Sequence, residues 1–131
     1  MNTDVIHQVM AETQEGKLIF PEVVRRLAEA GVESYFVDLA SHRETFYLAD
    51  GKTRTEPMTL QPDFIADDFS SSGVVAAIRE AQADTIRYPE FLKQSAKAGV
   101  CAYWAFLTGR QVIYFGRKGE MHIEKFPRSA S

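Results

Sequence analysis

The chain of 131 residues has a single cysteine, Cys101, so no disulfide bond can form within it. It also lacks any stretch close to the roughly 20 consecutive apolar residues that a membrane-spanning helix needs, so we expect no association with a membrane. Its first ten residues, MNTDVIHQVM, do not show the basic region followed by an apolar region that is typical of a secretory signal. These absences predict a soluble, cytoplasmic protein.

The common catalytic motifs are missing as well. The sequence contains no Gly-x-Ser-x-Gly elbow, phosphate-binding loop, dinucleotide fingerprint or paired-cysteine site. Cys101 lies in the apolar run 100–107 with no neighbouring base, and we interpret it as a small core residue rather than a nucleophile. The sequence therefore favours a non-enzymatic protein without a cofactor, and leaves catalysis open as the second alternative.

The chain also has little excess charge. Its net charge is −3, whereas a protein dedicated to nucleic acid needs a basic surface that releases counterions. Basic residues do gather late in the chain, at Arg110, Arg117, Lys118, Lys125 and Arg128. Nucleic-acid binding through this late basic cluster is the weakest of the functional hypotheses.

What the sequence does have is a repeat. FPEVVRRLAEAGVESY at residues 20–35 returns as YPEFLKQSAKAGVCAY at residues 88–103, an offset of 68. In both copies, proline follows an aromatic residue where a helix begins, and Ala-Gly-Val stands where it ends. The order and constant spacing of these signals indicate an internal duplication.

The offset shortens to 67 in the first hairpin if identical residues are aligned there. Arg43 then falls on Arg110 and Tyr47 on Tyr114, and the register returns to 68 at Gly51. We therefore predict that one hairpin is a residue shorter than its equivalent.

Each repeat reads as two helices followed by three strands. The expected strands are residues 33–39, 44–49 and 52–56 in the first repeat, and residues 100–107, 111–115 and 120–126 in the second. We place the repeats at about residues 4–56 and 72–126 of one domain, 1–131, and expect Ser72 to cap the third helix. The segment 57–71 holds too many apolar residues for a free linker, so we interpret it as a bridge packed onto the core.

The predicted fold class is α+β, with an antiparallel sheet and helices packed on one side of it. Strand 100–107 is apolar on both faces, which predicts either a central position in the sheet or contact with a partner. The pattern does not decide between one sheet of six strands and two smaller sheets.

Two long runs resemble a known family, MNTDVIHQVMAETQEGKLIFPEVVRRLAEAGVESY and YPEFLKQSAKAGVCAYWAFLTGRQVIYFGRKGEMHIEKF. They are similar to the YbcV-like family of small bacterial and prophage-associated proteins, some of which bear the label phage envelope protein. The resemblance covers almost the whole chain. It implies no biochemical activity and transfers no catalytic residue.

The repeated polar residues are the candidate site. Tyr35 and Tyr103, with Arg43 and Arg110, could line a cleft where the halves meet and hold an anion. The alternative, which the pattern favours, is that the tyrosines fill half-buried strand positions and the arginines end hairpins.

A second pattern, Glu120, His122 and Glu124, places two carboxylates and an imidazole on one face of a strand. We interpret it as a solvated strand face and expect no metal.

Two functional hypotheses rank above nucleic-acid binding. The first is a binding or protein-interaction domain, with a homodimer as the partner to consider and any other partner unknown. The second is a small-molecule domain, for an anion or as an enzyme, that uses the repeated tyrosines and arginines.

Overall fold

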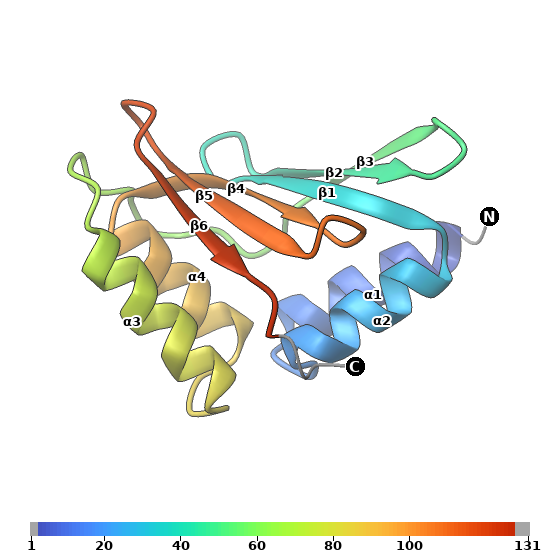
Figure 1. Ribbon diagram of the computed structural model, residues 1–131, viewed down its shortest axis with the longest axis horizontal. Helices are drawn as coiled ribbons and strands as arrows, with labels where there is room; N and C mark the ends of the chain where they lie inside the picture. The colour runs from blue at the N-terminus through green and yellow to red at the C-terminus, as the bar shows by residue number, and fades with distance from the viewer. Residues whose placement is uncertain (1–2, 128–131) are drawn as a thin grey trace.

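The structure is a computed structural model that describes residues 3–127. Four helices lie below a six-stranded antiparallel sheet, as Figure 1 shows. The first unit consists of α1 (Thr3–Gln14), α2 (Phe20–Glu29), β1 (Val32–Asp38), β2 (Arg43–Leu48) and β3 (Thr53–Pro57). The second unit consists of α3 (Ser71–Gln82), α4 (Tyr88–Lys97), β4 (Val100–Phe106), β5 (Gln111–Gly116) and β6 (Met121–Lys125). The predicted α+β fold class is confirmed.

The duplication holds through every element. Each helix and strand of the second unit begins 68 residues after its equivalent, and the two have the same length. The residues with positive φ repeat too, because His42 (61°) is matched by Arg110 (58°), and Gly31 (93°) by Gly99 (92°). The predicted one-residue shift is wrong. Both first hairpins have the same length, so the structural equivalent of Arg110 is His42 rather than Arg43.

All six strands belong to one sheet, in the order β3-β2-β1-β4-β5-β6. The two units therefore join through β1 and β4, the first strand of each. Strand β4 is central, which is one of the two alternatives that its two apolar faces predicted. Because β1 and β4 are antiparallel, Phe36 pairs with Trp104, its own equivalent in the other unit. The approximate two-fold axis that relates the units passes between these two side chains, whose ring centroids are 5.2 Å apart.

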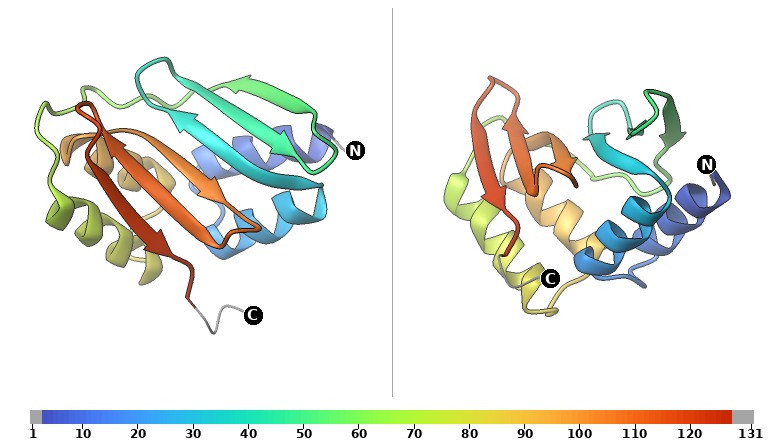
Figure 2. Two further views of the ribbon diagram at one scale, coloured as in Figure 1. Left: turned by 45° about the horizontal axis from the view of Figure 1, so that its top comes forward. Right: turned by 45° about the vertical axis from the view of Figure 1, so that its right-hand side comes forward.

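The helices cover one face of the sheet, with α1 and α2 under the first unit and α3 and α4 under the second (Figures 1 and 2). Strand alternation directs one set of side chains toward them, including the buried residues Tyr35, Val37 and Phe46. The other set, which includes Phe36 and Trp104, faces away from the helices. Among the described residues, no helix combines the length and apolar character needed to cross a membrane.

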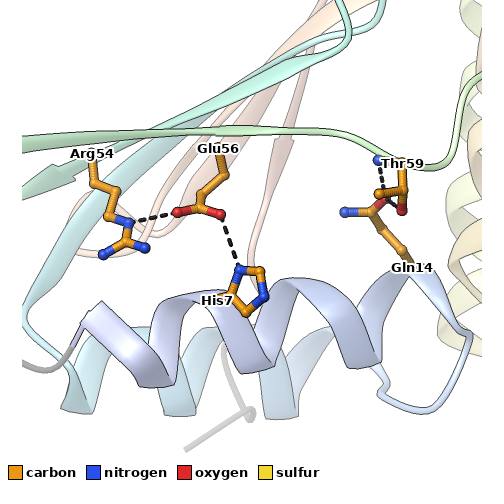
Figure 3. Close-up of polar contacts among 5 residues, drawn as sticks. All are labelled: His7, Gln14, Arg54, Glu56 and Thr59. Carbon is orange, nitrogen blue, oxygen red and sulfur yellow. Dashed lines mark hydrogen bonds and ion pairs between the residues drawn. The ribbon is translucent and has the colours of Figure 1, made fainter.

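The bridge between the units is tied to helices from both. Gln14 of α1 accepts hydrogen bonds through Oε1 from the backbone N–H and the hydroxyl of Thr59, at 2.9 and 2.8 Å (Figure 3). Further on, the N–H of Ala66 donates to the carbonyl of Ala96 in α4. Met58 is buried, and Leu60, Ile65 and Phe69 pack against the core.

The bridge ends in a helix cap. Helix α3 is capped by Ser70 rather than by Ser72 as predicted, because Ser70 Oγ accepts the N–H of Gly73 at 3.1 Å. The helix thus begins at Ser71, which places Ser72 inside its first turn.

Gly31 and Gly99 differ in what surrounds them, although both follow a helix with φ near 90°. A Cβ on Gly99 would lie 2.3 Å from the carbonyl oxygen of Asp68, because the bridge crosses the backbone at that point. A Cβ on Gly31 would meet nothing within 4 Å. The two positions thus separate the effect of backbone conformation from the effect of packing.

We predict that Gly99→Ala destabilises the protein more than Gly31→Ala. Both substitutions cost about 1–2 kcal/mol for the left-handed backbone. Gly99→Ala should cost roughly 1–3 kcal/mol more because the bridge must move. Urea denaturation of both variants measures the difference, and equal losses would contradict the close packing of the bridge.

Candidate functional site

A cleft of about 410 Å³ lies between the two helix pairs, beneath the central strands of the sheet. Both units line it with equivalent positions. Six of the aromatic members form three pairs related by the approximate two-fold axis: Phe20 and Tyr88, Tyr35 and Tyr103, and Phe46 and Tyr114. Two further rings, Phe91 of α4 and Phe126 after β6, have no aromatic equivalent in the first unit, where Val23 corresponds to Phe91. The cleft is therefore built by the duplication and is mostly apolar.

The rings of the wall contact one another from strand to strand. Tyr35 stacks on Phe46 with ring centroids 5.6 Å apart, and meets Tyr103 edge to face at 6.4 Å. Tyr103 lies 5.6 Å from Tyr114, which in turn meets Phe91 at 6.3 Å. Because these side chains are packed against one another on a sheet, the aromatic wall is preformed.

The tyrosine hydroxyls are the main polar groups of this wall. Tyr88 and Tyr103 share a hydrogen bond of 2.9 Å between their hydroxyl oxygens. The hydroxyls of Tyr35 and Tyr114 have no hydrogen-bond partner among the described residues. Burial raises the pKa of Tyr35, Tyr103 and Tyr114, so these hydroxyls stay protonated. The cleft thus offers hydroxyl groups that are free to hydrogen-bond a ligand.

Among the described residues, Glu44 is the one carboxyl group that lines the cleft and is buried. It points inward from β2, between Arg43 and Thr45, and only 7% of its surface is exposed. Its side chain makes no hydrogen bond or ion pair among the described residues. Ser95 Oγ is the only fully buried side-chain polar atom without a partner in the described part of the chain, so the Glu44 oxygens retain access to the cleft. Its equivalent in the second unit is Val112, so the carboxyl group breaks the symmetry of the wall.

Burial, and then the charge of Glu56, raise the pKa of Glu44 to about 8. Glu56 lies directly opposite Glu44 on the neighbouring strand β3. Burial alone would raise the pKa of Glu56 as well, but hydrogen bonds from His7 and Arg54 lower it. Figure 3 shows these two contacts, of 3.1 and 2.6 Å. These two adjacent carboxyl groups therefore differ in pKa, so that at neutral pH Glu56 is charged and Glu44 is mostly protonated.

The exposed lining residues lie at the mouth of the cleft. Phe20 is 41% exposed, and its ring meets that of Phe126 edge to face at 5.5 Å. Arg87 is held by Asp84 at 2.6 Å and by the carbonyl oxygen of Gly16 at 3.0 Å. The guanidinium group is therefore engaged at the rim and is not directed at the interior.

The structure separates the four residues of the predicted site. Tyr35 and Tyr103 lie together in the wall of the cleft, on either side of the two-fold axis. Neither arginine lines the cleft. Arg43 is exposed at the start of β2, next to the inward-facing Glu44. Arg110 lies over the ring of Phe126 at 5.4 Å and donates to the carbonyl oxygen of Pro127.

The Glu120, His122 and Glu124 pattern does not gather around one point. Glu120 accepts the backbone N–H of Lys118 in the turn before β6. Glu124 contacts His122 at 3.2 Å and Arg79 of α3 at 2.7 Å. Within residues 3–127, no cluster of three metal-ligating side chains occurs.

Two of the five residues of the late basic cluster are paired with the bridge. Arg117 contacts Asp67, and Lys118 contacts Asp68. Arg128 lies outside the described residues. Cys101 is partly buried next to this region, and burial raises the pKa of its thiol, which opposes a nucleophilic role.

One family model matches part of the chain, and its description names no function. Residues 1–55 match a family described as "Protein of unknown function (DUF1398)". No curated protein matches the chain. The matched segment extends from α1 into β3, and so covers almost the whole first unit, Glu44 included.

Sequence reasoning missed Glu44, Tyr88 and Phe91. A signal for Glu44 was present, because it shares the period-two face of Phe46 and Leu48, which are apolar. A charged residue on the apolar face of a strand predicts a buried carboxyl group. Tyr88 was visible only as part of the repeat, because its contact with Tyr103 depends on how helix and sheet pack.

We predict opposite pH effects on stability for two neighbouring substitutions. Glu44→Gln should stabilise the protein increasingly as pH rises from about 4.5 to about 8, because the unfolded wild type ionises in this range and the folded one does not. Glu56→Gln should lower the stability of the protein at neutral pH, because the pKa of Glu56 is lowered in the folded state. This loss of stability should become smaller in acid, where Glu56 is protonated in the wild type as well. Urea denaturation from about pH 2 to pH 9 measures both, because the effect of Glu56 appears below its ordinary pKa and that of Glu44 appears above it. Parallel pH profiles for the two variants would contradict the assigned protonation states.

Proposed function

We propose that the protein binds a small, mostly apolar organic molecule in the cleft between its two units. The observation that carries this proposal is Glu44, a buried carboxyl group that faces the cleft without a partner among the described residues. An unpaired polar group at 7% exposure destabilises a fold. Such a group is commonly retained where it contacts a ligand.

The size and lining of the cleft support a ligand role. Ligand pockets usually enclose about 300–1,000 Å³ and combine apolar walls with a few polar groups. This cleft has about 410 Å³, a wall of aromatic rings, and the unpartnered groups of Glu44, Tyr35 and Tyr114. No serine, cysteine or histidine of the described residues lines it, so binding is better supported than nucleophilic catalysis.

Filling the cleft should abolish binding. Ala81 of α3 lines the cleft, whereas Ala76 of the same helix is exposed and does not. A thermal-shift screen of metabolites should give hits with the wild type and with Ala76→Phe, and none with Ala81→Phe. A ligand at a hundred times its dissociation constant stabilises the folded state by about 2.7 kcal/mol, which is readily measured. Hits that survive in Ala81→Phe would place binding elsewhere.

A second candidate function is self-association through the face of the sheet that the helices leave open. Trp104 stacks there on Tyr47 and Phe106, with ring centroids 5.4 and 5.2 Å apart. Met121 and Ile123 of β6 point to the same side and are 57% and 48% exposed. An aromatic and apolar surface with few charges is typical of homodimer interfaces, so we propose a second copy of this chain as the partner.

Ile123→Asp tests this second candidate. We expect the wild type to scatter light as a dimer and Ile123→Asp as a monomer, because a charge would have to be buried at the interface. Ala76→Asp, on the opposite side of the molecule, should remain dimeric. A wild-type protein that is monomeric at high concentration would dismiss the candidate.

A further inference from the structure

The charged groups around the cleft indicate the chemical class of the ligand. Its lining includes three carboxyl groups, Glu44, Asp84 and Glu124, and two basic groups, Arg87 and Lys125. Both basic groups belong to the mouth, where Arg87 is already bound by Asp84 and Gly16, and Lys125 is exposed. The interior therefore holds no cationic side chain among the described residues, and an anion bound there would meet Glu44.

The aromatic wall, in contrast, favours a bound cation. The face of a tyrosine or phenylalanine ring carries partial negative charge and attracts a cation, most strongly where water is excluded. Tyr35, Tyr103 and Tyr114 are buried and packed in a continuous series, next to Phe46 and Phe91. Several rings around one space and a carboxyl group among them are the arrangement that recognises an organic ammonium ion.

We propose that the cleft binds an organic cation, with its ammonium group against the aromatic wall, its apolar body along the lining, and Glu44 as its counter-ion. This inference rests on the proposed small-molecule function and narrows it to one class of ligand. Glu44 is suited to the role because it is buried, faces the cleft and has no other partner among the described residues. Its neighbour Glu56 is not suited to this role, because it is already paired with His7 and Arg54.

Binding of a cation should be linked to the protonation of Glu44. Without a ligand, the carboxyl group is mostly protonated at neutral pH, since its pKa is about 8. A cation stabilises the carboxylate, so it lowers this pKa and binding releases a proton. Affinity for a cation that does not itself titrate should therefore increase as pH rises toward 8.

The groups that surround Glu44 do not titrate in the same range. Those that interact with it are Glu56 on β3, Tyr35 on β1, Tyr103 on β4 and Tyr88 on α4. The pKa of Glu56 is lowered and those of the tyrosines are raised, which places all of them outside the interval between pH 6 and 8. His7 of α1 contacts Glu56 and does not line the cleft, and α2 contributes apolar residues.

Three probes of nearly the same shape test the ligand class by calorimetry. They are (2-phenylethyl)trimethylammonium, its neutral isostere (3,3-dimethylbutyl)benzene, and the anion 4-phenylbutanoate. We expect the cation to bind about tenfold or more tightly than the neutral isostere, and the anion not to bind measurably. Because a quaternary ammonium group has no proton to lose, any pH dependence of its affinity reports on the protein.

Two variants test whether Glu44 causes the preference for the cation and its pH dependence. Glu44→Gln should weaken the cation about tenfold, leave the neutral isostere unchanged, and remove the increase in affinity between pH 6 and 8. Glu33→Gln, which removes an exposed carboxylate of β1 outside the cleft, should bind all probes as the wild type does.

The possible failures can be told apart. Equal binding of cation and neutral isostere, or preference for the anion, would overturn the cation assignment and leave a small-molecule site in place. Binding of the cation that is unaffected by both Glu44→Gln and Ala81→Phe would overturn the assignment to this cleft. If no probe binds and the metabolite screen is silent as well, the proposed function falls together with the inference.

Discussion

The structure depends on the pairing of β1 with β4. Each unit alone is a three-stranded sheet with two helices on one side, and this contact joins the two sheets into one. Antiparallel pairing places Phe36 opposite Trp104 and thereby fixes the approximate two-fold axis. The same register sets Tyr35 and Tyr103 on either side of that axis, on the face that the helices cover. The cleft is therefore a consequence of how the repeats meet, since it lies where neither unit's helices fill the space.

Much of this fold was predictable from the sequence, because it follows from local signals that occur twice. Proline at the start of α2 and α4, and glycine after each, mark the helix ends, and alternation marks the strands. The choice of one sheet over two was not predictable, because it depends on contacts between units. The error in register came from aligning Arg43 with Arg110. At that turn the two repeats share the backbone conformation and not the residue type, because His42 and Arg110 both have a positive φ.

The site was predicted in part, for reasons that differ by residue. Tyr35 and Tyr103 were found because they are identical in both repeats and lie on the apolar face of their strands. The arginines were misleading because they do not occupy equivalent positions, since Arg110 corresponds to His42, and neither arginine lines the cleft. Glu44 was missed because its inward direction was not inferred from its alternation with the apolar residues Phe46 and Leu48. Its burial depends on β3 beside it and on the helices beneath, which the sequence of β2 does not contain.

The two edge strands, β3 and β6, have one more consequence. Each directs a glutamate toward the helices, at the equivalent positions Glu56 and Glu124, and each pairs it with a basic group two residues earlier, Arg54 or His122. A foreign strand that added to either edge would extend the sheet past these paired charges and have to cover them. The paired charges at both edges therefore oppose edge-to-edge growth of the sheet, even though its aromatic face is left open by the helices.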